Sequence, residues 1–255
     1  MPSDPDGVRL ARRTVDVLGG MGPAASAHFC LRLAEVTAAW RDQDHLRVMD
    51  SDPSVPDRTA FLLGRRADPA PSLIAMAGRL VRAGADLLVL ACNSASPFTG
   101  RVVAAVLDWA GEAVGALLDQ VGSSSSVGVL CTDGTAWAGL RQRRLQAHHV
   151  AALLADEAAQ ATVIGAIYDI KAGAAGLTDR REQVLQVARG LAARGLAARG
   201  ASALLIACTE LSLLFRNGAD WPVPATDATD AVAARTVVRA GGRLRAQDLA
   251  CRPLA

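Results

Sequence analysis

Short apolar runs alternate with amphipathic stretches along most of the chain. Four runs rich in Val, Leu, Ile and Ala each end in glycine or a small polar residue, and a helical stretch follows each of them. Residues 71–83 place apolar side chains such as Leu73 and Ala77 at helical spacing, which gives one apolar face. This alternation predicts parallel strands joined by crossover helices, so the expected fold class is α/β. The predicted strands are residues 14–18, 87–91, 127–130 and 203–207.

The chain also resembles itself at a separation of about half its length. GADLLVLAC at residues 84–92 matches GASALLIAC at 200–208, and VDVLGGMG at 15–22 matches VGVLCTDG at 127–134. These repeats predict two pseudo-symmetric halves, each with a mainly parallel sheet flanked by helices. The expected first half is residues 14–109 plus about 225–240, the second is 110–224, and 1–13 and 241–255 are expected to be flexible tails.

Cys92 and Cys208 follow equivalent predicted strands. Ligands of open α/β sheets bind beyond the carboxyl ends of the strands, so two halves that face each other would bring both thiols to one cleft. That geometry suits a two-base racemase, in which one thiolate removes a proton and the opposite thiol donates one. The alternative is that both are small buried hydrophobes, as free cysteines often are. Polar residues after each cysteine, such as Asn93 and Thr209, favour chemistry, although such residues also cap helices.

Composition narrows the class of partner. The 255 residues are 51% hydrophobic and carry a formal net charge of +2. The electrostatic potential is therefore too weak to favour binding to nucleic acid or to an anionic membrane. No apolar run approaches the roughly 20 residues of a membrane helix, and residues 1–13 lack the apolar stretch of a secretion signal, which predicts a cytoplasmic protein. The five cysteines form no CxxC pair, and neither they nor the histidines show metal-ligand spacing. A small-molecule partner is expected.

A thiol that acts as a base at neutral pH needs a lowered pKa. A free cysteine with a pKa of about 8.5 is only slightly ionised at neutral pH, and a helix N-terminus or a nearby cation lowers that value. Lys171 is the one lysine among 27 Lys and Arg residues, which indicates a site-specific ammonium; chance survival on a surface loop is the alternative. Arg58 follows Pro56 and Asp57 like a turn residue, and its alternative reading is an ordinary surface charge.

At its motifs the sequence resembles the aspartate/glutamate racemase superfamily, and most closely the aspartate racemase branch. The resemblance extends from Val15 to about Ala234 and rests on seven motifs in order. They are GGMGP at 19–23, RDQDH at 41–45, PDRT at 56–59, CNSA at 92–95, DGT at 133–135, IKAG at 170–173 and CTEL at 208–211.

The resemblance implies an isomerase that interconverts L and D amino acids without pyridoxal phosphate or any other cofactor, and without a metal. It implies a homodimer with the active site between two domains, where Cys92 and Cys208 act as acid and base. Arg58 and Lys171 occupy the positions at which this branch contacts the substrate side-chain carboxylate or tunes the thiols.

The resemblance also assigns residues to the rest of the substrate. It implies that Asn93, Ser94 and Thr209 hold the α-carboxylate. Met21 and Thr132 are expected to line the site.

The sequence departs from the family pattern at several points. Ser94 and Ser96 replace the threonine and histidine of the usual CNTAH motif, and the loop at residues 50–54 carries two aspartates where the family has asparagines. An aspartate- or glutamate-like substrate is expected, but a neutral or cationic side chain is the alternative if Asp52 points into the cleft. A tandem LAARG at 191–200 predicts a helix distortion near Gly195.

Two other functions stay open on the same scaffold. One is a sister cysteine-dependent isomerase acting on a non-standard substrate such as a hydantoin, and the other is a catalytically silent ligand-binding homologue. Retention of both thiols disfavours a one-thiol decarboxylase. Of the other cysteines, Cys30 is expected in the core, Cys131 at a strand end near the cleft, and Cys251 in a tail.

Overall fold

The chain forms two four-stranded sheets with the same strand order. The computed structural model describes residues 13–46, 48–49, 54–102, 105–122, 126–193 and 200–246. The first sheet has the order β2-β1-β3-β4 and the second β6-β5-β7-β8, and every pair of neighbouring strands is parallel. Their bounds are β1 Val15–Leu18, β2 Val48–Met49, β3 Leu87–Leu90, β4 Val106–Leu107, β5 Ser126–Cys131, β6 Ala151–Leu153, β7 Ala203–Ala207 and β8 Ala225–Asp227.

The central strands explain the sequence pattern. All residues of β1, β3, β5 and β7 are buried, as expected for parallel strands that are covered on both faces, and all are apolar or glycine except Asp16 of β1 and Ser126 of β5. The last paired residues are Leu18 with Leu90 in one sheet and Cys131 with Ala207 in the other. The predicted α/β class with two equivalent sheets is confirmed, and Cys92 and Cys208 lie just beyond corresponding strand ends.

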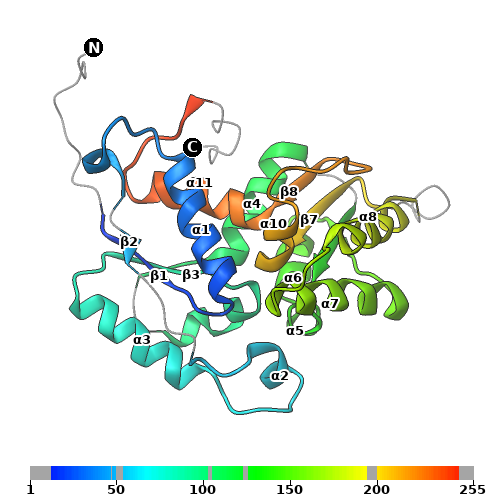
Figure 1. The fold of residues 1–255 in the computed structure, drawn as a ribbon, viewed down its shortest axis with the longest axis horizontal. Helices are drawn as coiled ribbons and strands as arrows, with labels where there is room; N and C mark the ends of the chain where they lie inside the picture. The colour runs from blue at the N-terminus through cyan, green and yellow to red at the C-terminus, as the bar shows by residue number, and fades with distance from the viewer. Residues whose placement is uncertain are drawn as a thin grey trace.

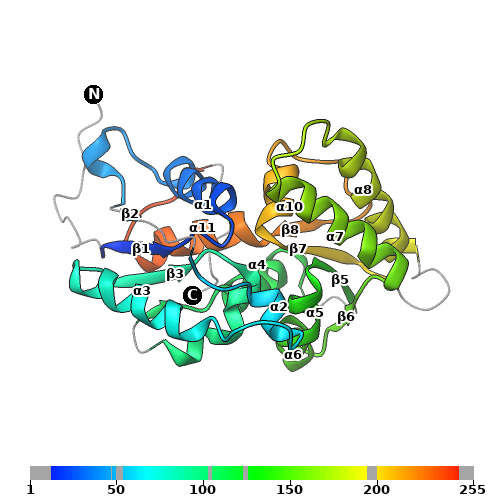
Figure 2. The same ribbon diagram turned by 60° about the horizontal axis from the view of Figure 1, so that its bottom comes forward.

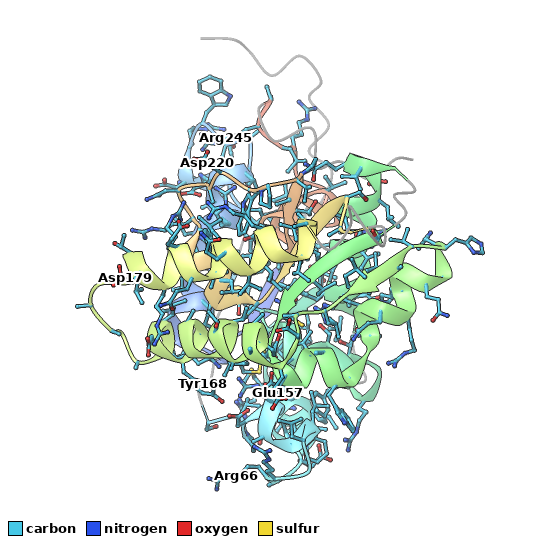
Figure 3. The ribbon with its side chains drawn as sticks, turned by 90° about the vertical axis from the view of Figure 1, so that its right-hand side faces the viewer. Arg66, Glu157, Tyr168, Asp179, Asp220 and Arg245 are labelled. Atoms are coloured by element: carbon cyan, nitrogen blue, oxygen red, sulfur yellow. The ribbon has the colours of Figure 1, made fainter. Side chains whose placement is uncertain are left out.

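Helices flank both sheets (Figures 1 and 2). The helix predicted at residues 71–83 is α3, Ala70–Arg82. On the side of the second half, α7 and α8 lie next to each other in front of the sheet (Figure 3). The helices are α1 Pro23–Val36, α2 Arg58–Leu62, α3, α4 Trp109–Val121, α5 Asp133–Ala138, α6 Leu140–Ala147, α7 Glu157–Lys171, α8 Thr178–Ala193, α10 Thr209–Leu214 and α11 Ala228–Arg239, with 3-10 turns η1 Asp42–Asp44 and η2 Asn93–Arg101.

One apolar core joins the two halves. It contains buried side chains of both sheets, together with Trp109 of α4 and Val232 of α11. Helices α4 and α11 contact each other and lie between the two lobes (Figure 2). Arg235 of α11 forms a buried ion pair with Glu112 of α4 at 3.1 Å and also pairs with Asp119. The halves are therefore joined through a shared central layer, while two further cores fill the outer sides of the sheets.

Two structural details lie at the expected boundaries of the halves and of the C-terminal tail. Strand β8 pairs with β7, so residues 225–227 belong to the second sheet and the chain returns to the first half at Ala228. The C-terminal tail does not begin at Gly241, because Leu244 is buried and pairs with Thr37 in an antiparallel bridge.

Several predictions fall on residues outside those that the structure describes. These include the orientation of Asp52, the helix distortion near Gly195, and residues 1–12 and 247–255, with Cys251 among them. None of the described helices is both long and apolar enough to cross a lipid bilayer.

Candidate active site

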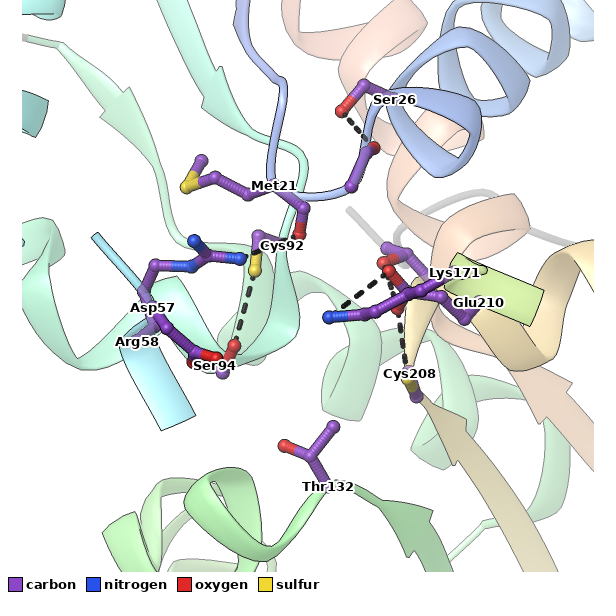
Figure 4. Close-up of polar contacts among 12 residues, drawn as sticks. Met21, Ser26, Asp57, Arg58, Cys92, Ser94, Thr132, Lys171, Cys208 and Glu210 are labelled. Atoms are coloured by element: carbon purple, nitrogen blue, oxygen red, sulfur yellow. Dashed lines mark hydrogen bonds and ion pairs between the residues drawn. The ribbon is translucent and has the colours of Figure 1, made fainter. Parts of the chain in front are cut away.

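The two thiols occupy equivalent positions at the strand ends. Cys92 follows β3 and precedes η2, and Cys208 follows β7 and precedes α10; both have extended backbone and both are buried. In Figure 4 the two side chains lie on opposite sides of one space, which Met21, Lys171 and Thr132 border. The repeat in the sequence therefore brings the two cysteines to a common place.

A hydroxyl group and a fixed amide accompany Cys92. Its Sγ lies 3.3 Å from Ser94 Oγ, and either atom can donate. Asn93 Oδ1 accepts hydrogen bonds from Trp109 Nε1 at 3.1 Å and from Arg141 Nη2 at 2.5 Å. Asn93 Nδ2 is buried without a hydrogen-bond partner among the described residues. The amide is thus held in one orientation with a donor left for a ligand.

Arg141 of α6 was not predicted as a site residue. Its side chain is 1% exposed and also donates from Nη1 to the carbonyl oxygen of Asn93 at 3.2 Å. Burial lowers the pKa of Arg141 to about 10, and the nearby thiols of Cys131 and Cys92 oppose that shift, so the guanidinium is charged at neutral pH. Its segment, LRQRRLQA, reads as a solvated basic helix face, and the sequence carries no signal that one of these arginines is buried.

A carboxylate accompanies Cys208. The thiol donates to Glu210 Oε2 at 3.3 Å, and Thr209 Oγ1 donates to the same oxygen at 3.2 Å. Burial raises the pKa of Cys208 well above its usual range, and the charge of Glu210 acts in the same direction. Lys171 and the backbone N–H groups of Glu210 and Leu211 oppose the rise. The Cys208 thiol is therefore protonated at neutral pH.

Lys171 is the last residue of α7 and reaches toward the space between the thiols (Figure 4). Its Nζ lies 3.7 Å from Glu210 Oε1. Burial lowers the pKa of Lys171, but the attraction of Glu210, and then of Cys92 and Cys208, outweighs burial, so the net shift is upward. A cation at a helix C-terminus is also favoured by the helix dipole. The single lysine therefore lies beside Glu210 at the end of α7, with its side chain 35% exposed.

Arg58 is buried and acts as a link between loops. Its guanidinium donates to the carbonyl oxygens of Met21 at 3.0 Å, Val55 at 3.2 Å and Pro56 at 3.1 Å. The alternative of an ordinary surface charge is wrong. Thr132 is the N-cap of α5, and its hydroxyl accepts from the backbone N–H of Thr135 at 3.2 Å.

The model of the Asp/Glu/Hydantoin racemase family matches residues 18–236. The chain belongs to this family. It is a racemase, and the expectation of an isomerase is confirmed.

Solved structures of other racemases have the same fold. Picrophilus torridus aspartate racemase is 26% identical, with a TM-score of 0.79 over 94% of this chain and 99% of that chain. Glutamate racemase from Francisella tularensis in complex with D-glutamate is 15% identical, with a TM-score of 0.59 over 90% and 81%. Allantoin racemase from Klebsiella pneumoniae is 17% identical, with a TM-score of 0.58 over 95% of each chain. The last two similarities show the fold alone.

Two glycines of the racemase allow close approach at the site. A Cβ atom on Gly22 would lie 3.0 Å from Glu210 Oε1. A Cβ atom on Gly134, at the start of α5, would lie 2.8 Å from the Cα atom of Thr59 in α2. Helices α5 and α2 belong to different halves, so Gly134 permits contact between the halves beside the site.

The other two cysteines in the described part of the racemase, Cys131 and Cys30, pack in or against the shared core. Burial raises the pKa of Cys131 to about 12, and its side chain lies in the shared core, so it is an unreactive packing residue. Cys30 is half-buried in α1 and packs against the same core. Within the described part of the chain, no group of three or more His, Cys, Asp or Glu side chains is placed to hold a metal ion.

Proposed function

We propose that this racemase inverts the α-carbon of an amino acid by proton transfer between Cys92 and Cys208. The supporting observation is the pair of buried thiols at equivalent strand ends, on opposite sides of one space (Figure 4). Inversion requires that a proton leave one face of the carbon and that another arrive on the opposite face. Two thiols placed in this way can serve as the base and the acid.

The reaction needs no group beyond those described. One thiolate removes the α-proton and forms an S–H bond, while the electrons of the C–H bond move into the carboxylate and give an enediolate-like anion. The opposite thiol then gives its proton to the other face of the carbon. Asn93 Nδ2, a buried donor with no partner in the described residues, is suited to bind the anion.

An aspartate- or glutamate-like substrate fits the charges of the site. Two buried side chains, Arg58 and Arg141, are positive, one buried side chain, Glu210, is negative, and Lys171 adds a further positive charge. The similarity to an aspartate racemase at 26% identity supports the same substrate class. The test is α-proton exchange in D₂O, followed by NMR, for both enantiomers of aspartate, glutamate, serine and arginine. Exchange with arginine alone would contradict the acidic substrate.

Single-thiol variants test the mechanism. Cys92→Ser and Cys208→Ser should each lower the racemisation rate at least about 10³-fold, because each removes one of two acid–base groups. Each variant can still exchange the α-proton of one enantiomer. Circular dichroism of the substrate measures racemisation, and Cys30→Ser is the control that should keep full activity. Full racemisation by Cys208→Ser would refute the two-base scheme.

We also propose that the racemase is a homodimer, on the basis of the family resemblance. Analytical ultracentrifugation of the purified chain tests this, and a monomer at micromolar concentration would contradict it.

A further inference from the structure

The two cysteines have different hydrogen-bond partners at the same relative position. Ser94 stands two residues after Cys92, and Glu210 stands two residues after Cys208. Each side chain lies 3.3 Å from the sulfur of its cysteine (Figure 4). The hydroxyl of Ser94 can donate to a thiolate or accept from a thiol. A carboxylate oxygen accepts hydrogen bonds, and the thiol of Cys208 is the donor to Glu210 Oε2, so this sulfur carries a proton in the hydrogen bond.

Glu210 is itself fixed on several sides. It is 5% exposed, and Oε2 accepts from both Cys208 Sγ and Thr209 Oγ1. Oε1 has no hydrogen-bond partner among the described residues and lies 3.7 Å from Lys171 Nζ. Gly22 leaves room for this oxygen, because a Cβ atom there would lie only 3.0 Å away. The carboxylate of Glu210 and the ammonium of Lys171 thus form an ion pair at the site.

We propose that Glu210 is a positioning residue that keeps the proton of the thiol pair on Cys208 in the resting enzyme, so that Cys92 is the thiol that starts as the base. The proposal rests on the two-thiol function proposed above. Lys171 opposes the effect of Glu210 on Cys208. Its ammonium neutralises Glu210 and attracts both thiols in their ionised forms. The upward shift of the Cys208 pKa, caused by burial and then by Glu210, agrees with this assignment.

The proton balance of a turnover follows from this resting state. The Cys92 thiolate takes the α-proton and becomes a thiol. The S–H bond of Cys208 breaks, its proton joins the opposite face of the carbon, and the sulfur keeps the electron pair. Glu210 and Cys208 are then both negative, with Lys171 beside them. The resting state returns when Cys92 releases its proton to water and Cys208 takes one from water.

Alkylation of each cysteine by iodoacetamide as a function of pH tests the proposal without any turnover. The full chain is alkylated for a fixed time, and mass spectrometry of the peptides gives the midpoint of the rate profile for each sulfur. Midpoints are compared because limited access to a buried sulfur changes the rate and not the midpoint. In Glu210→Gln the Cys208 midpoint should fall by about one pH unit or more, because a like charge is removed. The Cys92 midpoint should stay within a few tenths of a unit, as expected for a charge that acts on Cys208.

Three further variants complete the test. Glu210→Asp keeps the charge and should keep the Cys208 midpoint high. Lys171→Met should move the Cys208 midpoint upward, the opposite direction to Glu210→Gln, which tests the proposal even if Glu210→Gln does not fold. Glu157→Gln, at the exposed start of α7 (Figure 3), is the matched control and should move neither midpoint.

Two results would overturn the role of Glu210. They are an unchanged Cys208 midpoint in folded Glu210→Gln, and a Cys208 midpoint that falls in Lys171→Met. A chain that racemises no amino acid but shows the expected midpoints would instead refute the proposed function and leave the role of Glu210 in place.

Discussion

The loops that carry the two cysteines have the same place in the fold and opposite charges around them. The Cys92 loop is bound by a cation, because buried Arg141 donates to both the side chain and the backbone of Asn93. The Cys208 loop is bound by carboxyl groups, since Glu210 accepts from the thiol and Asp227 accepts from Ser212 Oγ at 2.7 Å. The repeated backbone thus places two thiols symmetrically, while a few side chains make their protonation unequal.

Among changes to the residues around the two cysteines, removal of the cation on the Cys92 side should have the largest effect. Arg141→Met keeps the length of the side chain but removes the donors to Asn93. Loss of this orientation should lower the racemisation rate about 100-fold, as misplacement by about 1 Å can do. Steady-state kinetics measures the loss, and circular dichroism confirms the fold. Arg143→Met, on the exposed face of the same helix, should keep the wild-type rate; equal losses in both variants would contradict a specific role of Arg141.

The two cysteine loops face each other only if the two halves of the chain are in contact. Gly134→Ala tests that contact. Its Cβ would lie 2.8 Å from the backbone of Thr59, which cannot move away as a flexible side chain would. The free energy of unfolding should fall by about 1–3 kcal/mol, the usual cost of overpacking. Urea denaturation measures it. Gly190→Ala, in α8 with no atom within 4 Å of its added Cβ, is the control and should be neutral or stabilising. Wild-type stability of Gly134→Ala would show that the contact is loose.

Ser94→Ala removes the neutral partner on the Cys92 side. A neutral hydrogen bond contributes about 0.5–1.5 kcal/mol, so the racemisation rate should fall by about tenfold at most. The loss should be smaller than that for Glu210→Gln, because hydrogen bonds to charged groups are stronger. Steady-state kinetics of both variants under the same conditions measures the two losses. A larger loss for Ser94→Ala would contradict the expectation that the charged partner, Glu210, contributes more than the neutral partner.

The smallest effect concerns Asp227, whose carboxyl group accepts a hydrogen bond from Ser212. Burial, and then repulsion by Asp230, raises the pKa of Asp227 from its usual 3.8 to about 7. Between these two pH values the folded protein binds more protons than the unfolded chain, so stability should fall as the pH rises from about 4 to about 7.

Asp227→Asn keeps an oxygen acceptor at the N-cap of α11 and cannot ionise, so this slope should flatten. Thermal unfolding at several pH values measures it. Asp179→Asn, at an exposed position of α8 (Figure 3), should keep the wild-type slope. Parallel slopes for all three proteins would mean that Asp227 does not titrate in this range.

The sequence predicts the central strands well because a buried parallel strand is a continuous apolar run. The edge strands β2, β4, β6 and β8 have two or three residues, too few to carry a pattern. Both cysteines follow from the internal repeat. The pairing of Glu210 with Lys171 and the burial of Arg141 do not, since the partner of a charge depends on contacts between distant segments. The sequence does carry one signal of this asymmetry. The repeat places Ser94 and Glu210 at matching positions, so the difference between them predicts different surroundings for the two thiols.

The shared core also has a consequence for synthesis on the ribosome. Helix α11 follows the whole second half in the chain, yet Val232 and Val237 pack in one core with Val15 and Phe29 of the first half. The first sheet therefore emerges from the ribosome long before the helix that completes its cover. Nascent chains normally fold domain by domain from the N-terminus, but here the half made first must wait, with apolar surface open to chaperones, until the residues of α11 have left the exit tunnel.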